Sequence, residues 1–164
     1  MNSLTVILIF IAGIILQLTV ADSMAIAGSQ PDFIIIVLVS IAVRKNPIVA
    51  VIIGFLLGFL QDLANPVFLG MNALSKSLLA YAISRIGGAY LPHTLFYFAL
   101  LVFSSCLVND VIVLNIVYNF SISDVLFSFF RFSIVTALYS TAIAILLYIL
   151  VVFFELVGVR NRTI

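Results

Sequence analysis

Charged residues are scarce in this chain. Only 8% of its 164 residues are Asp, Glu, Lys or Arg, whereas 65% are hydrophobic and the mean hydropathy is +1.40. A soluble globule needs more polar surface than this composition can supply, so the chain is expected to lie in lipid. The net charge of +1 argues equally against nucleic-acid binding, which requires a large basic patch.

Cysteine and histidine are nearly absent as well. The single Cys106 cannot form an internal disulfide, and the single His93 has no partner at metal-ligand spacing on a helix. The chain also lacks a Ser-His-acid set at one plausible depth, paired carboxylates on one helix face and a glycine-rich phosphate loop. We therefore expect no metal, no cofactor and no enzymatic activity.

What the chain does contain is a succession of apolar runs separated by polar turns. Its length suits a single integral membrane domain, residues 1–164, of about five or six spanning helices of roughly 20 residues each. We predict an all-α polytopic membrane protein with six transmembrane helices. The predicted spans are about 4–20, 32–43, 47–64, 71–85, 94–118 and 124–157.

The first two spans leave alternatives open. The apolar run 4–18 could be a signal peptide, but it lacks a positively charged start, and we expect a retained span. The run 33–43 covers only roughly 17 Å of a hydrocarbon core of about 30 Å, so it forms either a short span or a re-entrant hairpin with the third span. Pro31 and Asp32 are suited to the first turn of this helix, where Asp faces the positive end of the helix dipole.

The distribution of charge predicts the topology. With six spans, both termini share one side of the membrane with all the loop and tail cations, and the opposite loops carry only acids. The positive-inside rule then places both termini in the cytoplasm of a plasma membrane. A five-span arrangement would divide the cations between the two sides and ranks second. The cations are Arg44, Lys45, Arg85, Arg160 and Arg162, and the acids are Asp22, Asp32 and Asp124.

Four ionisable residues fall inside predicted spans rather than in loops, namely Asp62, Lys76, Asp110 and Arg131. Counting helical rise from the span ends puts all four at a similar depth in the outer half of the bilayer. Each would cost about 2.5 to 3.5 kcal/mol if it faced lipid alone, so we expect two acids and two bases to face inward and pair. Such a polar cluster serves either as a structural lock or as part of a transport path.

Amide and small residues follow the same helical stripes as these charges. On the third span, the small and polar positions are Gly54, Gly58, Gln61, Asp62 and Asn65. Asn72 lies four residues before Lys76, Asn109 precedes Asp110, and Ser128 and Arg131 are three residues apart, so each set is expected to share a helix face. The two glycines predict a close helix contact, either an internal seam or an oligomer interface.

The segment from Gly54 to Lys76 resembles the bacterial rod shape-determining protein MreD. The resemblance rests on the order of Gly54-Phe-Leu-Leu-Gly58-Phe-Leu-Gln61-Asp62-Leu and Leu69-Gly70-Met-Asn72-Ala-Leu-Ser75-Lys76, supported by the Pro-Asp start of the second span and by the chain length. The family is similar in fold to the S components of energy-coupling-factor transporters. The resemblance implies that Asp62, Asn72 and the glycines, including Gly70, hold the third and fourth spans together.

The resemblance also implies a function and a set of partners. Such a protein would be a non-enzymatic scaffold of the cell-elongation (rod) complex in the bacterial inner membrane, would bind MreC directly, and would act in control of cell shape and lateral peptidoglycan synthesis. MreB, RodA and a class B penicillin-binding protein would belong to the wider complex, and a homodimer is conceivable. The alternative is a small-molecule-binding membrane subunit of a transporter, like an S component, with a pocket that opens outward.

Overall fold

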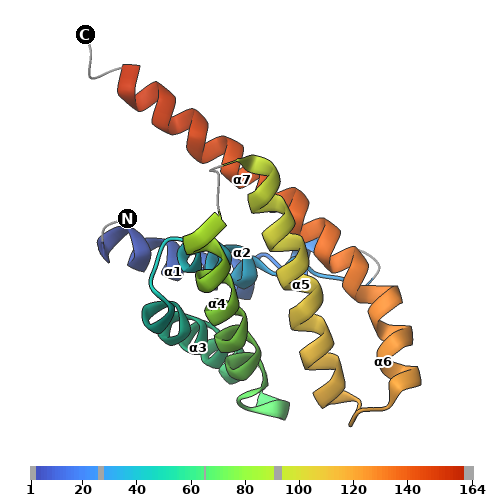
Figure 1. Cartoon of the computed structure of the whole chain (residues 1–164). Coiled ribbons are helices and arrows are strands. Elements are labelled where there is room, and N and C mark those ends of the chain that lie inside the picture. The colour runs from blue at the N-terminus through green and yellow to red at the C-terminus, as the bar shows by residue number, and fades with distance from the viewer. Residues whose placement is uncertain (1–2, 26–27, 65, 91–93, 161–164) are drawn as a thin grey trace.

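The described residues, 3–25, 28–64, 66–90 and 94–160 of a computed structural model, form helices joined by short turns (Figure 1). The α-helices are α1 (Ser3–Thr19), α2 (Phe33–Ala42), α3 (Pro47–Ala64), α4 (Met71–Tyr90), α5 (Leu95–Val117), α6 (Ile122–Ser128) and α7 (Ile134–Arg160). Two 3₁₀ turns, η1 (Asp22–Met24) and η2 (Pro66–Phe68), lie in the connections, and a π-helical turn, η3 (Phe129–Ser133), joins α6 to α7.

These helices confirm the predicted all-α membrane protein, and their bounds follow the predicted apolar runs closely. Within the described residues, three helical segments are long and apolar enough to cross a bilayer: Pro47–Ala64, Leu95–Val117 and Ile122–Leu150. The last of these combines α6, η3 and the start of α7, so one continuous helix corresponds to the predicted sixth span. α2 has only 10 residues, about 15 Å of helix.

The short helix α2 is the centre of the bundle. Nine of its ten residues are buried, all except Ser40, and it contacts α1, α3, α4, α5 and α7. Figure 1 shows it between the α3–α4 pair and the α5–α7 pair. A helix that is apolar on every side must be enclosed by other helices. Its surroundings therefore explain a sequence of nearly uninterrupted Ile, Val and Leu.

The helices α3 and α4 pack side by side over most of their length (Figure 1). A Cβ atom at Gly54 would lie 2.5 Å from the Lys76 carbonyl oxygen, and one at Gly58 would meet the backbone of Asn72 and Ala73. The contacts run in opposite directions along the two helices, so the pair is antiparallel. The two predicted packing glycines thus lie in an internal seam where backbone touches backbone.

The turn η3 shifts the register of the last helix. In it, the Ile134 N–H donates to the Phe129 carbonyl, the i→i+5 bond of a π-helix. The buried stripe consequently passes from Ser128 to a position five residues on, and then continues at α-helical spacing. The buried positions are Ser128, Ser133, Ala137, Ser140 and Ala144. The small residues of this stripe face α5, α2 and the polar residues described below.

Candidate functional site

Asp62, near the end of α3, caps the start of α4. Its carboxylate accepts four hydrogen bonds: from the backbone N–H groups of Gly70 (3.0 Å), Asn72 (3.1 Å) and Ala73 (3.0 Å), and from the Asn72 side-chain amide (2.9 Å). The side chain is buried. Inside a bilayer, the free N–H groups of a helix start have no water to bond to. A carboxylate satisfies them and also faces the positive end of the helix dipole.

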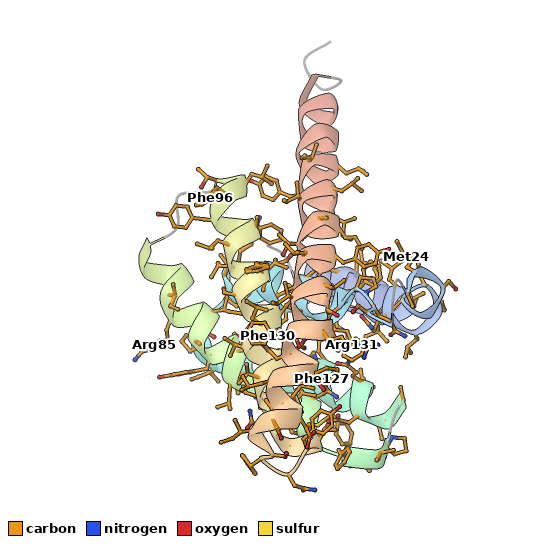
Figure 2. All side chains as sticks on the ribbon, turned by 90° about the vertical axis from the view of Figure 1, so that its right-hand side faces the viewer. Met24, Arg85, Phe96, Phe127, Phe130 and Arg131 are labelled. Carbon is orange, nitrogen blue, oxygen red and sulfur yellow. The ribbon has the colours of Figure 1, made fainter. Side chains whose placement is uncertain are left out.

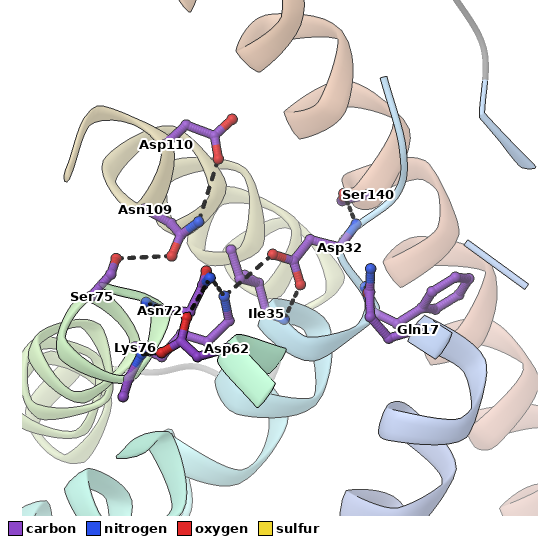
Figure 3. Close-up of polar contacts among 12 residues, drawn as sticks. Gln17, Asp32, Ile35, Asp62, Asn72, Ser75, Lys76, Asn109, Asp110 and Ser140 are labelled. Atoms are coloured by element: carbon purple, nitrogen blue, oxygen red, sulfur yellow. Dashed lines mark hydrogen bonds and ion pairs between the residues drawn. The ribbon is translucent and has the colours of Figure 1, made fainter. Parts of the chain in front are cut away.

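Lys76 carries the positive charge of this region and is completely buried, with 0% exposure. Its ammonium donates to Asn72 Oδ1 at 3.3 Å and lies 3.6 Å from Asp32 Oδ2 (Figure 3). Asn72 therefore bridges Asp62 to Lys76, because its amide nitrogen bonds the carboxylate and its oxygen accepts from the ammonium. The ion pair of Lys76 therefore joins α4 to the start of α2. Its partner is Asp32, and not Asp62 of α3.

The start of α2 is satisfied by side chains from three helices. Asp32 Oδ1 accepts from the Ile35 N–H at 2.9 Å, Gln17 Oε1 of α1 accepts from the Phe33 N–H at 2.8 Å, and Ser140 Oγ of α7 accepts from the Asp32 N–H at 2.9 Å (Figure 3). The predicted placement of Asp32 at the positive end of this helix is confirmed. Three backbone donors at the start of this short helix, those of Asp32, Phe33 and Ile35, therefore have side-chain partners inside the bundle.

A second branch connects α4 to α5. Ser75 donates to Asn109 Oδ1 at 2.8 Å, and the Asn109 side-chain amide donates to Asp110 Oδ1 at 3.4 Å (Figure 3). Ser75 and Asn109 are both buried. We call the residues of both sets of contacts together the polar network, defined as Asp32, Asp62, Asn72, Ser75, Lys76, Asn109 and Asp110. It contains three of the four ionisable residues predicted to gather.

The structure does not bring Arg131 to the polar network. Its side chain is exposed, and the guanidinium lies over the rings of Phe127 and Phe132 (Figure 2). The prediction assumed that Ser128 and Arg131, three residues apart, share a face of an α-helix. In the π-helical turn the buried face recurs at Ser133, which directs Arg131 away from the bundle interior. The expected pairing of two acids with two bases is therefore not observed, because Arg131 lies outside the polar network.

The remaining predicted residues have separate positions. Gln61 is half-buried, and its Oε1 is buried without a hydrogen-bond partner in the described structure, while Asn65 lies outside the described residues. Gly70 adopts φ +93°, and a Cβ there would meet nothing within 4 Å. Gly70 thus serves the turn into α4, where glycine tolerates a positive φ, and not a packing seam.

Four residues of this region were not predicted as site residues: Gln17, Asp32, Ser75 and Ser140. Asp32 was predicted at the first turn of this helix, as its place before a buried apolar run indicates, but it was counted with the loop acids and left out of the intramembrane set. Because α2 starts inside the bundle, its cap lies beside Lys76 of α4. Gln17 and Ser140 stand on apolar helices with no local pattern that indicates their partner, so only the tertiary arrangement identifies them.

The fold and the polar network define an all-α membrane protein whose intramembrane polar side chains bind helices to one another. The family described as rod shape-determining protein MreD matches residues 1–156. The chain belongs to this family, which confirms the resemblance inferred from its motifs and gives it a role in rod-shape determination. No curated protein and no solved structure gives a significant match, so the expected similarity to S components stays a prediction.

Proposed function

We propose that this chain is a non-enzymatic scaffold of the cell-elongation complex that holds the single membrane span of MreC against its own helices. The observation that supports this proposal is that the polar residues form hydrogen bonds and an ion pair within the protein. Asp32, Asp62, Asn72 and Lys76 bond to helix starts and to one another. A network engaged in this way makes a rigid bundle, which suits a protein that acts by presenting a surface.

The surface that we propose for the partner span lies on α3 and α4. An open groove of about 360 Å³ runs along this pair. Its lining is almost entirely apolar, and the rings of Phe55 and Phe59 stack in it with centroids 5.9 Å apart. The lining residues are Phe55, Phe59, Leu69, Gly70, Ala73, Leu74 and Ser77. Large side chains on one helix beside small ones on the other create a recess for side chains of another helix.

We also propose that both termini are cytoplasmic. The antiparallel contacts of α3 and α4 put Arg44 and Lys45 at the same end of this pair as Arg85. α5 and the continuous helix of α6, η3 and α7 are antiparallel as well, since Phe98 contacts Tyr148 of α7 and Tyr118 bonds Ser128 of α6. Clustering of loop cations on one membrane side supports this orientation under the positive-inside rule.

Co-purification from membranes tests the scaffold. Tagged protein is extracted in mild detergent, and the retained MreC is quantified for wild type, Phe59→Ala and the control Phe96→Ala. Both phenylalanines are exposed, at 36% and 72%, but only Phe59 lines the groove. We expect Phe59→Ala to reduce retained MreC several-fold and Phe96→Ala to leave it unchanged. Retention of a small metabolite without MreC would instead support the transporter-subunit alternative.

A further inference from the structure

Arg131 is a cation in η3 whose side chain points away from the helix bundle. Its side chain is exposed, and the neighbouring Leu126, Phe127 and Phe130 are 50%, 63% and 66% exposed. Within the described part of the chain, no carboxylate lies within ion-pair distance of its guanidinium. An arginine that faces lipid with no opposite charge is costly. Its surroundings must therefore supply an anion or bring it to the interface.

The guanidinium is held in a defined place by two aromatic rings. Its central carbon lies 5.6 Å from the ring centroid of Phe127 and 5.2 Å from that of Phe132; Figure 2 shows Arg131 beside Phe127. The π-helical turn directs the side chain to this surface, and the backbone of Phe132 is held by the Ser29 hydroxyl, which donates to its carbonyl at 3.3 Å. Stacking on rings leaves the donors of the planar guanidinium available for a further partner.

The depth of this site matches that of lipid headgroups. α6 begins at Ile122, next to the exposed polar residues Ser123 and Asp124, which suit the membrane surface. At 1.5 Å per residue, the backbone of Arg131 lies about 14 Å along the helix from that start. The guanidinium lies over the rings of both Phe127 and Phe132, and a long arginine side chain can extend from its backbone toward the surface. The guanidinium is thus near the boundary between headgroups and acyl chains.

We propose that Arg131, positioned by Phe127 and Phe132, binds the phosphate of an anionic phospholipid, with an acyl chain lying along Leu126 and Phe130. Arginine binds phosphate through two parallel N–H bonds, a geometry that a point-like ammonium does not provide. The exposed apolar side chains beside it fit an acyl chain. A partner carboxylate at this depth would itself have to be removed from water, which favours the lipid as the occupant.

Lipid retention by the purified full chain tests this site. The probe is phosphatidylglycerol added to the protein in neutral detergent, with phosphatidylcholine as the reference lipid and native mass spectrometry as the readout. Arg131→Gln should reduce phosphatidylglycerol retention by roughly tenfold, and Arg131→Lys, which keeps the charge, should lose part of it. The matched control is Arg85→Gln, because Arg85 is also exposed and lies 5.8 Å from the Tyr81 ring centroid.

Equal losses in Arg131→Gln and Arg85→Gln would overturn the proposal, since they would show general charge attraction. Loss of a co-purifying protein with unchanged lipid retention would also overturn it, in favour of a partner carboxylate. Displacement of the lipid by an equal concentration of inorganic phosphate would indicate a free-phosphate site and contradict a lipid site. Should Arg131→Gln not fold, Phe127→Leu retains the cation and removes one ring, and it should weaken retention several-fold.

Discussion

Lys76 of α4 and Asp32 at the start of α2 form an ion pair within the bundle, with Nζ 3.6 Å from Oδ2 and side-chain exposures of 0% and 13%. The same carboxylate also caps its own helix through Ile35. Asp62 repeats this arrangement at the start of α4. Each acid is therefore stabilised by a helix N-terminus, and one lysine is enough to connect the two capped helices through Asn72.

Neutralising Lys76 should destabilise the protein strongly. Lys76→Met keeps most of the side-chain volume but leaves Asp32 without its cation. Loss of one member of a buried pair typically costs about 3 to 5 kcal/mol. Reversible unfolding in mixed detergent micelles would measure this change. Arg44→Gln, at an exposed position, is the control and should change the free energy of unfolding by less than about 0.5 kcal/mol.

Asp32→Asn should rescue part of that loss. An asparagine can still cap α2, but it removes the negative charge that Lys76→Met leaves unpaired. The double variant is expected to be more stable than the sum of the two single effects predicts, with a coupling of about 1 kcal/mol or more. Additive effects in this cycle would contradict the ion pair as an energetic unit.

Asp62 should not tolerate even an isosteric change. Its two oxygens accept four N–H donors, so in Asp62→Asn the new amide nitrogen would face backbone donors. We expect Asp62→Asn to lower the melting temperature in detergent nearly as much as Asp62→Ala, because each orphaned buried donor costs about 1 to 3 kcal/mol. Asp124→Asn is the control, since that carboxylate is exposed and accepts from Ser121. A stable Asp62→Asn would refute the capping role.

The sequence predicts much of this arrangement because hydropathy and helical spacing are local properties. They place the helices close to their observed bounds and identify Asp62, Asn72 and Lys76 as facing other helices. They do not reveal the partner of Lys76, because Asp32 is far from it in sequence and acts from a helix start. They also misplace Arg131, because no residue pattern marks a π-helical turn, which changes the face of every residue within it.

The glycines should differ in how much they tolerate a methyl group. Gly58→Ala would press against the backbone of Asn72 and Ala73, and Gly54→Ala against the Lys76 carbonyl. Neither obstacle can move without separating α3 from α4, so we expect each to cost about 1 to 3 kcal/mol. The atoms nearest to a Cβ at Gly13 belong to the Val37 side chain and not to backbone, and a side chain yields more readily than the backbone of a packed helix. Thermal unfolding in detergent should therefore rank Gly13→Ala as the mildest of the three, and equal losses would contradict the seam.

Deleting one residue should be tolerated in the π-helical turn but not in the regular helix that follows. Without Phe130, Ser128 and Ser133 would become four residues apart, the spacing at which an α-helix keeps both on one face. Without Leu138, Ser140 would rotate by about 100° relative to Ser133, and its bond to the Asp32 N–H would be lost.

Phe130 and Leu138 are matched for this comparison because both are apolar and exposed, at 66% and 58%. We expect the Phe130 deletion to yield folded protein with a small change in melting temperature, and the Leu138 deletion to lower the melting temperature strongly or prevent folding. Size-exclusion chromatography and thermal unfolding in detergent would measure both. Equal damage from the two deletions would mean that the extra residue of the turn is required for folding. That result would contradict the interpretation of the extra residue as an insertion, which the bundle accommodates by turning Arg131 outward.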